Sequence, residues 1–314
     1  MSLQCWLRCF PEASIFLLLP SGQLKLEFAA NHNLLFTYSK NIDFPKLENL
    51  NDAYVMQDFR NLLLPSDVQY AQLFTQHVFA VNYFKFDLYH GSVILLNSSL
   101  TKADKALTMN THQQDSYTEL SAMLSSAYLR WNSNLSWEQR LPVIQHKFSI
   151  SGNFIQVQNY NFIDDIPNKT KSLLYSLRGS LFSNFSNEYI NYELGVVFSK
   201  EIDSYTLYGN KQRINRISPL LNLHGKILPQ LRYLLSNTYE SFTTTSSNRK
   251  YNNLSCQFSY TREASKFSFW VNAVNLLNLE NPELKALSST NNMFATEIIT
   301  RMPGYIGIGI GYAL

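Results

Sequence analysis

The sequence lacks any apolar run long enough to form a membrane-spanning helix. Near its start the longest such run is Ile15 to Leu19, whereas a spanning helix needs about 20 apolar residues. The core of an export signal needs at least about 7. The sequence therefore excludes a helical membrane protein, and it contains no convincing export signal.

Charged residues are also scarce. Asp, Glu, Lys and Arg make up 16% of the 314 residues, against about a quarter in soluble domains, so the composition is unusual for a soluble protein. The formal net charge is only +3, and the basic residues form no stripe with interleaved aromatic residues. This distribution gives no support to nucleic-acid binding.

Residues suited to covalent or metal chemistry are few and scattered. Cys5, Cys9 and Cys256 do not have metal-ligand spacing, and the six histidines belong to no HExxH or Cys-His signature. Asp164 and Asp165 form a carboxylate pair, but no third acidic residue or histidine lies at a usable sequence spacing, so solvated loop charge is the better interpretation. We expect no enzyme activity, no cofactor and no resident metal.

Aromatic residues and strict alternation are what the sequence has instead. It contains 19 Tyr and 21 Phe, and its last ten residues alternate between two kinds of side chain. This period is that of a β-strand with one apolar face, and a soluble protein rarely exposes such a strand at an edge. On one side lie Ile306, Ile308, Ile310, Tyr312 and Leu314, and on the other Gly307, Gly309, Gly311 and Ala313.

The same period-two pattern recurs along the chain between polar, turn-rich breaks, and this favours strands over helices. Charged residues fall on the polar side of these segments, as at Arg178, Glu193, Arg232 and Glu240. An Arg or Lys side chain that faces lipid near the middle of a membrane costs about 2–4 kcal/mol. In a membrane barrel these residues, together with Lys147, are therefore expected to face the lumen.

Connection lengths favour a transmembrane barrel. Outer-membrane barrels have short turns on one side and long loops on the other. The sequence therefore predicts an all-β fold, a transmembrane antiparallel up-and-down β-barrel of about 14 strands, with residues 1–314 as one domain. Short links at 140–143, 184–188, 226–229 and 262–266 alternate with longer polar ones near 41–72, 99–116, 159–170, 201–212, 243–250 and 279–292. The predicted strands are 12–19, 23–29, 33–40, 73–83, 86–98, 117–140, 145–158, 171–184, 188–200, 213–226, 230–242, 250–261, 266–278 and 293–314.

Two structural alternatives remain open at this point. A two-sheet sandwich would bury the apolar faces against each other, and periodicity alone does not distinguish it from a barrel. Residues 116–130 also carry Leu120, Met123, Leu124 and Ala127 at helical spacing, which predicts a helix there as the alternative to a strand.

Aromatic residues in the long connections are the candidates for ligand contact. Tyr160, Phe162, Tyr205 and Tyr208 lie in two of these connections, where they could stack on a ligand. They could equally form part of the aromatic girdle that barrels place at the membrane interface, and this second interpretation is favoured.

Four segments, taken in their order and spacing, resemble those of a known family. Residues 38–45 are similar to a strand end that leads into a Pro-initiated long loop, and residues 269–278 to the penultimate strand, with Leu277 in an aromatic position. Residues 301–304 are similar to a Pro-Gly entry into the last strand, and residues 309–314 to a terminal assembly signal. On these segments the chain resembles the C-terminal barrel portion of TonB-dependent outer-membrane receptors, in particular the Bacteroidetes-type outer-membrane β-barrel family.

The resemblance implies gated uptake of a scarce nutrient, such as a siderophore or glycan, in the cell outer membrane. The partners would be outer-membrane lipid, a plug domain, the TonB complex and a small nutrient ligand. Barrels of this family have about 22 strands, so the chain would be an incomplete part of one, with the plug domain absent. Lys147, Arg178, Glu193 and Arg232 would contact the plug or the substrate, or simply line a hydrated interior.

The resemblance also assigns Gly309, Tyr312 and Leu314 to the signal that the barrel-assembly machinery reads, although Leu314 replaces the usual terminal aromatic residue. Two other functions remain open. One is a complete, plugless outer-membrane channel of about 14 strands. The other is a soluble or surface adhesive β-protein with a sandwich or solenoid core.

Overall fold

The structure is a computed structural model. It describes residues 2–10, 13–29, 31–43, 53–66, 68, 74–87, 89–185, 188–207, 209, 211–244, 248–262, 265–277, 283–290, 293–300 and 303–312, with side chains except at 2–18, 126, 283–290 and 293–300. Within these residues the chain is almost entirely β-strand. The strands are β1 (Ser2–Phe10), β2 (Ala13–Ala29), β3 (His32–Asp43), β4 (Val55–Met56), β5 (Asn61–Leu63), β6 (Phe74–Asp87), β7 (Ser92–Gln113), β8 (Thr118–Leu141), β9 (His146–Ile163), β10 (Ile166–Ser183), β11 (Asn191–Tyr205), β12 (Lys211–Leu228), β13 (Leu231–Thr244), β14 (Asn248–Thr261), β15 (Phe267–Val274), β16 (Glu283–Thr290), β17 (Met293–Thr300) and β18 (Tyr305–Tyr312).

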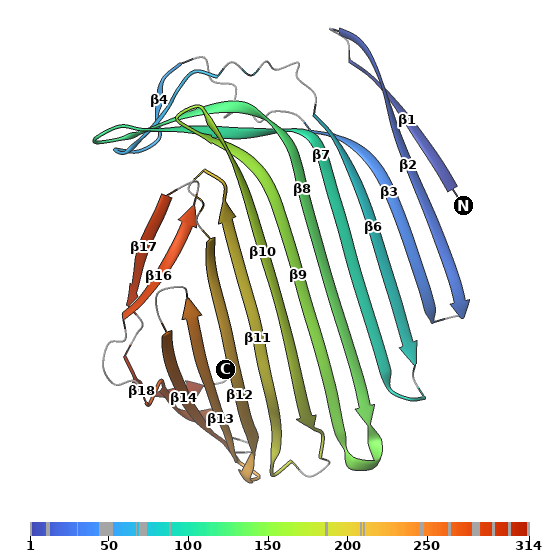
Figure 1. Cartoon of the computed structure of the whole chain (residues 1–314). Helices are drawn as coiled ribbons and strands as arrows, with labels where there is room; N and C mark the ends of the chain where they lie inside the picture. The colour runs from blue at the N-terminus through green and yellow to red at the C-terminus, as the bar shows by residue number, and fades with distance from the viewer. Residues whose placement is uncertain are drawn as a thin grey trace.

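The strands form one long antiparallel sheet in which each strand lies beside its neighbours in the chain (Figure 1). The order is β1-β2-β3-β6-β7-β8-β9-β10-β11-β12-β13-β14-β15-β18, while β16 and β17 form a separate hairpin. This order confirms the all-β, up-and-down part of the prediction. Among the described residues β1 and β18 stand at opposite edges and do not pair, so the sheet is open.

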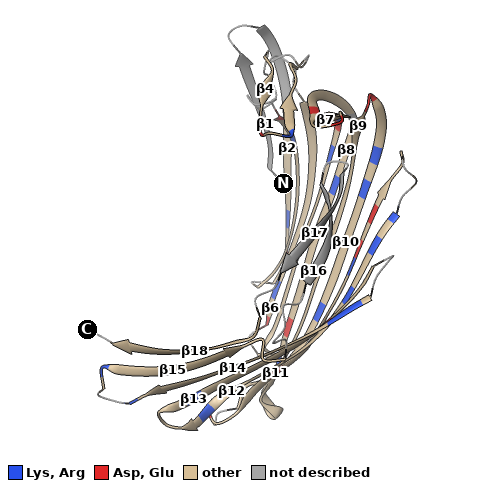
Figure 2. Ribbon diagram, turned by 90° about the vertical axis from the view of Figure 1, so that its left-hand side faces the viewer, with Lys and Arg blue, Asp and Glu red and all other residues tan. Residues whose placement is uncertain are grey.

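The sheet is strongly curved. Figure 2 shows that the C-terminal strands β12 to β15 and β18 turn away from the direction of the N-terminal strands, and that charged residues are sparse along the ribbon. Residues directly opposite each other in an antiparallel pair share a face, so the register defines two faces that run across the whole sheet.

One of these faces, which we call the apolar face, is lined by large apolar side chains. In register across β15 and β18, Val271 lies opposite Ile308 and Phe269 opposite Ile310. The face continues through β10 and β11, where Leu177 lies opposite Phe198 and Leu181 opposite Leu194. Its other members include Leu34, Phe36, Phe79, Tyr83, Leu96, Trp131, Leu135, Trp137, Phe148, Ile150, Phe154, Val196, Leu221, Leu223, Leu235, Phe258 and Tyr260.

The opposite face, which we call the polar face, carries most of the Asn, Ser, Arg and Glu side chains, although Val197 and Leu220 also lie on it. The apolar face is the more exposed of the two: Ile308 is 77% exposed and Val196 46%, whereas the Glu193 side chain is only 14% exposed. Side chains crowd on the concave side of a curved sheet and diverge on the convex side. We therefore assign the polar face to the concave side.

The strand prediction is correct in its pattern and wrong at several boundaries. The predicted strands 12–19 and 23–29 form one strand, β2, because Ser21 and Gly22 pair with β1 on one side and with β3 on the other. This pairing overrides the local turn chemistry of the Pro-Ser-Gly sequence. The sequence did not predict β1, and predicted strand 293–314 is divided into β17 and β18, which pair with different partners.

The helix considered for 116–130 does not form, because these residues pair with β7 as part of β8. The helical turn that the structure describes is a short 3-10 segment, Pro142–Ile144, between β8 and β9. Within the described residues, no helix is long and apolar enough to cross a membrane.

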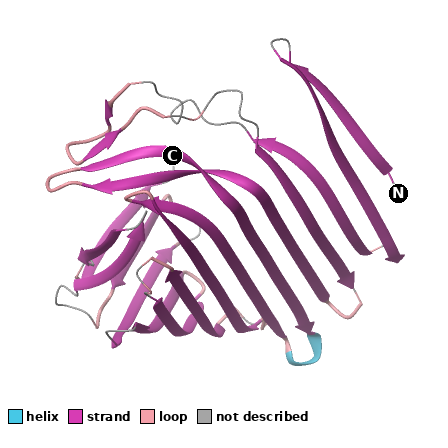
Figure 3. Ribbon diagram, turned by 45° about the horizontal axis from the view of Figure 1, so that its top comes forward, coloured by secondary structure: helices cyan, strands magenta, loops and turns pink. Residues whose placement is uncertain are grey.

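The predicted alternation of short and long connections is wrong between β6 and β15, where the turns at both ends of the sheet are short because most of the predicted long polar connections are strand. Residues 99–113, 159–163 and 166–170 are parts of β7, β9 and β10. The strands therefore extend well beyond their neighbours at the end of the sheet that carries the β7–β8 and β9–β10 turns, which we call the distal end (Figure 3). At the opposite, proximal end the turns are short, with two residues between β12 and β13.

The sandwich alternative has no support among the described residues. The second sheet there is the small β16–β17 hairpin, which makes no extensive contact with the strands of the long sheet. The apolar face of the long sheet therefore has no second layer packed on it within the part of the chain that the structure describes.

Candidate functional site

Two Arg-x-Ser segments on the polar face build matching ion pairs. On β10, Arg178 donates from Nε to Ser180 Oγ (3.2 Å) and from Nη2 to Glu193 Oε1 of β11 (2.5 Å). On β12, Arg216 makes the same two bonds to Ser218 (3.2 Å) and to Glu240 of β13 (2.5 Å). Each serine holds its guanidinium group in place, and charge-assisted bonds of this kind are the stronger class of hydrogen bond.

The first ion pair continues into a polar network. Asn222 Nδ2 donates to Glu193 Oε2 (2.8 Å), and Ser236 Oγ donates to Asn222 Oδ1 (2.7 Å). Four strands, β10 to β13, are thus joined on the polar face. Both carboxylate oxygens of Glu193 accept a hydrogen bond. These bonds compensate for the loss of water around a side chain that is only 14% exposed.

The predicted lumen-facing residues all lie on the polar face. Lys147 pairs with Glu138 at 3.6 Å and lies 4.6 Å from the centre of the Phe182 ring. Arg232 lies opposite Lys226 and Ser259, in register with the same face. The register thus places Lys147, Arg178, Glu193 and Arg232 on one surface. Contact with a plug or substrate stays a prediction.

A row of asparagines also crosses the polar face. Asn82, Asn97, Asn134 and Asn153 lie directly opposite one another on β6, β7, β8 and β9. The described residues supply no side-chain hydrogen-bond partner for Asn153 Oδ1, although that atom is buried. Neighbouring strands are about 4.8 Å apart, so the row offers regularly spaced neutral donors and acceptors to water or to a polar occupant of the concave side.

At the distal end the β7–β8 ribbon bends across the end of the sheet, as Figures 1 and 3 both show. We call residues 105–126 of this ribbon the overhang. The β8–β9 pairing stops at Leu129 and Gln158. Farther along, it is β7 that meets β9, with Asn110 beside Phe162 and Thr111 beside Ile163 in a parallel pairing. The overhang therefore crosses over the end of β9.

The overhang also pairs with the small β4–β5 hairpin. Strand β5 lies parallel to the start of β8, with Leu62 opposite Glu119 and Leu63 opposite Leu120. The backbone N–H of Thr118 donates to the carbonyl of Arg60 (2.6 Å). Residues that are far apart in the sequence are thus assembled into one distal structure.

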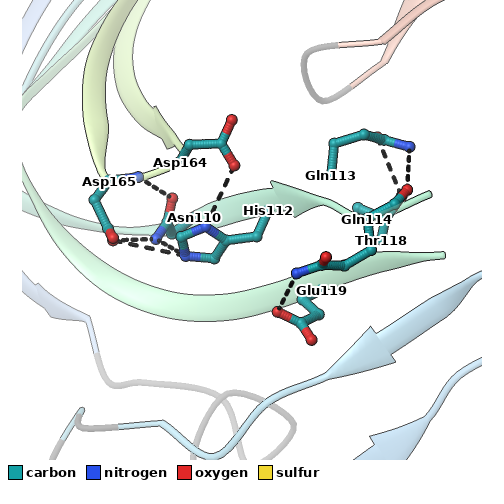
Figure 4. A network of polar contacts seen from close by, with 8 residues as sticks. All are labelled: Asn110, His112, Gln113, Gln114, Thr118, Glu119, Asp164 and Asp165. Atoms are coloured by element: carbon teal, nitrogen blue, oxygen red, sulfur yellow. Dashed lines mark hydrogen bonds and ion pairs between the residues drawn. The ribbon is translucent and has the colours of Figure 1, made fainter.

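Figure 4 shows the polar network that attaches the overhang to the β9–β10 turn. Asn110 Nδ2 donates to Asp165 Oδ1 (2.7 Å), and the backbone N–H of Asp165 donates to Asn110 Oδ1 (3.3 Å). His112 lies between the two carboxylates: its Nδ1 is 3.4 Å from Asp164 Oδ1 and its Nε2 is 3.6 Å from Asp165 Oδ1. Asn110 is 1% exposed, so this network is partly buried.

The β9–β10 turn has the geometry of a tight hairpin. Asp164 and Asp165 both have positive φ, at 50° and 64°, which is the requirement of a two-residue type I′ turn and is tolerated by Asp. The backbone N–H of Asp164 donates to the Thr111 carbonyl (3.1 Å). Both carboxylates contact the overhang, yet their side chains are 59% and 74% exposed, so the expectation that the pair is largely solvated is confirmed.

A second buried amide, Asn168, organises the next turn. Its side chain is fully buried, donates to Asn161 Oδ1 (3.0 Å) and accepts from the backbone N–H of Leu207 (3.1 Å). Thr206 adds hydrogen bonds to Lys169. The β9–β10 hairpin and the β11–β12 turn are therefore fixed to each other at the distal end.

Metal binding has no support in this region. Within the part of the chain that the structure describes, no group of three or more His, Cys, Asp or Glu side chains is arranged to hold a metal ion. At the distal network the two imidazole nitrogens of His112 face different carboxylates, so the donors do not converge on one point.

The aromatic ligand candidates are not brought together. Tyr160 and Phe162 lie within β9 rather than in a loop, on the same side of the sheet as the apolar face, and Lys169 Nζ lies 5.7 Å from the centre of the Tyr160 ring. Tyr205 lies at the end of β11 on the opposite face, and Tyr208 lies outside the described residues. A shared aromatic ligand site built from these residues has no support in the structure.

The three assembly-signal residues have different surroundings. Tyr312 lies on the apolar face beside Phe267, with ring centres 5.0 Å apart. Gly309 lies opposite Trp270 on the polar face, and a Cβ atom placed on it would lie 2.0 Å from the indole ring. Leu314 lies outside the described residues.

Sequence reasoning missed the distal network because its members are far apart along the chain. Asn110 and His112 are more than fifty residues from Asp164 and Asp165, so no local spacing signal joins them. The one usable signal was the Asp-Asp pair, which fits a tight hairpin turn.

Comparison with known proteins adds no assignment. No protein-family model matches this chain, and no curated protein is significantly similar to it.

Proposed function

We propose that this chain forms part of the wall of an outer-membrane β-barrel, and that it serves as the barrel part of a TonB-dependent receptor for nutrient uptake. In this proposal the apolar face contacts lipid and the polar face lines the lumen. Further strands close the barrel, and a plug domain occupies the interior.

The observation that carries the proposal is the continuity of the apolar face. Large apolar side chains follow one another in register from β3 to β18 and are exposed at the convex surface, with Ile306, Ile308 and Ile310 each at least 67% exposed. A contiguous exposed apolar surface of this extent is rare on monomeric soluble proteins. Hydrocarbon is a solvent in which such a surface is stable.

The length of the strands supports the same proposal. Strands β9, β10 and β12 each have 18 residues and β13 and β14 have 14, whereas strands of globular proteins average about 5–6 residues. A tilted crossing of the hydrocarbon layer needs about 9–11 residues. The longer strands have enough length left to project beyond the membrane at the distal end.

The asymmetry of the two ends supports an outward-facing distal end. Outer-membrane barrels keep their periplasmic turns short and build their binding loops on the outer side. Here the asymmetry lies in the strands: β7 and β8 project at the distal end as the overhang, which also carries the β4–β5 hairpin, while the proximal end has no such projection among the described residues. The distal structure is therefore the proposed location for nutrient capture, and uptake involves no covalent chemistry.

Surface accessibility in intact Gram-negative cells tests this proposal. A short epitope tag inserted in the β7–β8 turn, between Gln114 and Ser116, should be labelled by antibody on intact cells. The same tag between Pro229 and Gln230, in the proximal β12–β13 turn, should be labelled only after the outer membrane is opened. Labelling of both tags in intact cells, or recovery of the chain in the soluble fraction, would contradict the proposal.

A vesicle experiment distinguishes the receptor from the plugless channel. The purified chain, reconstituted in lipid vesicles, is not expected by itself to give steady, uniform passage of small sugars, because its sheet is open among the described residues. Uniform single-channel conductance from the chain alone would favour the complete, plugless channel.

A further inference from the structure

The overhang is joined to the rest of the sheet through a bend with unusual backbone geometry. Pairing of β7 with β8 runs through Ala103 and Tyr128 and resumes at Lys105 and Ser126. Between them Ala127 has φ of 45°. A non-glycine residue in this region is uncommon and marks a strained or specialised position. Residues that absorb changes in φ and ψ are where hinges occur.

Beyond this bend, the overhang meets the β9–β10 turn over a small area. The backbone contributes two register pairs and the bond from the Asp164 N–H to Thr111. The side chains contribute the network of Asn110 and His112 with Asp164 and Asp165. Among the described residues the overhang has two attachments beyond the β7–β8 ribbon itself: its pairing with β5 and this contact with the β9–β10 turn, where the side-chain network adds to the backbone bonds.

We propose that the overhang is a strap that opens and closes about the bend at Ala127, and that His112 and Asn110, bonded to Asp164 and Asp165, form the latch that keeps it closed. This inference goes beyond the proposed function, because it concerns the movement of one segment and holds whatever ligand the distal end takes.

The hydrogen bonds explain why these side chains suit a latch. The Asn110 amide nitrogen lies 2.9 Å from His112 Nε2 and 2.7 Å from Asp165 Oδ1, so its two protons can serve both partners. The contacts of Asn110 with Asp165, and of His112 with both carboxylates, join the overhang to the β9–β10 turn, so they are lost when the strap lifts.

Lifting the strap exposes a buried region. Asn110, Thr111 and Ile163 are each at most 7% exposed, and Ala122 and Ser125, near the bend, are at most 4% exposed. Side chains buried to a similar degree also occur elsewhere on the sheet, as at Ser180 and Ser218, each 3% exposed. Opening of the strap would expose the contact of Asn110 and Thr111 with the end of β9.

Amide hydrogen exchange on the full chain in detergent micelles, followed by mass spectrometry, tests the proposal. In the wild type, amides of residues 105–126 should exchange together and faster than those of β11 to β13, since a strap opens as a unit. Asp165→Asn makes the bond from Asn110 a neutral one and His112→Ala removes the imidazole, and each should raise exchange in residues 105–126 roughly two- to fivefold, because the two carboxylates are largely exposed. Exchange in β11 to β13 should not change.

Asp115→Asn is the matched control. It removes a carboxylate from the β7–β8 turn at the tip of the overhang, and no ion pair or side-chain hydrogen bond joins Asp115 to β9 or β10 among the described residues. Exchange in this variant should equal that of the wild type. Unchanged exchange in both latch variants would overturn the proposal, and so would a rise spread evenly over the whole sheet. Asp165→Asn, which preserves side-chain shape, decides the matter if His112→Ala fails to fold.

Discussion

Glycine residues on the polar side of β18 make room for side chains of β15. The indole ring of Trp270 occupies the space where a Cβ on Gly309 would lie, at 2.0 Å, whereas the nearest atoms to a Cβ on Gly307 are 3.9 Å away. Gly309 is therefore required for a steric reason, whereas a larger residue at Gly307 would meet no close neighbour.

This difference predicts the effects of two matched substitutions. Gly309→Ala should lower the free energy of unfolding by about 1–3 kcal/mol, because the new methyl group overpacks the Trp270 ring. Gly307→Ala should change it by less than about 0.5 kcal/mol. Urea titration of both variants in the same detergent or lipid measures the two values, and equal effects would contradict this account of Gly309.

At the scale of the strand, the account depends on alternation between the two faces. Val196 and Val197 are neighbours on β11, but Val196 lies on the apolar face opposite Gly179 and Val197 on the polar face opposite Arg178. An arginine that faces lipid near mid-membrane costs about 2–4 kcal/mol, and one in the lumen is tolerated.

The expected result is that Val196→Arg destabilises the protein in lipid vesicles by about 2–4 kcal/mol. Val197→Arg should destabilise the protein clearly less, although repulsion between the new side chain and Arg178 adds to its cost. The measurement is the free energy of unfolding of each variant in vesicles. A larger loss for Val197→Arg would reverse the assignment of the two faces.

The β4–β5 hairpin gives a pH-dependent prediction. The side chain of Asn61 and the backbone N–H of Arg60 donate to the Asp58 carboxylate, and these hydrogen bonds hold the pKa of Asp58 below its ordinary value. A carboxyl group with a lowered pKa stabilises the folded turn above the pKa of the unfolded chain, and this contribution is lost as the pH falls through the folded pKa.

Amide protection of Asn61 to Leu63, corrected for intrinsic exchange, should therefore be constant from pH 7 to about 5 and should fall below about pH 4. Asp58→Asn should remove this fall. Hydrogen exchange at several pH values makes the measurement, and a wild-type profile as flat as that of Asp58→Asn would show that the carboxylate does not support the turn.

The sequence predicted the strands well where one face is apolar and the other polar, as in β10, β11 and β14. It failed where pairing partners override local chemistry: Pro20 and Gly22 predict a break, yet β2 continues because strands pair on both sides of it. It also predicted long loops where the structure has strand extensions. Polar residues occupy both faces of these extensions, so the sequence there lacks the apolar–polar alternation by which a strand is recognised. The distal network depends on a fold-over of β7 and β8, which no local pattern contains.

At the scale of the whole molecule, the sheet has two faces of opposite character and two unpaired edges among the described residues. The proposed function assigns the apolar face to lipid. It therefore places Trp137 in hydrocarbon and Trp270 in the hydrated interior.

Tryptophan fluorescence quenching by brominated lipids tests this claim most directly. Two single-tryptophan variants of the full chain, one that keeps Trp137 and one that keeps Trp270, are reconstituted in vesicles with bromine on the acyl chains. Trp137 lies opposite Ile150 on the apolar face, and Trp270 lies opposite Gly309 on the polar face. The account predicts strong quenching of Trp137 and little quenching of Trp270, whereas equal quenching, or none for Trp137, would contradict it.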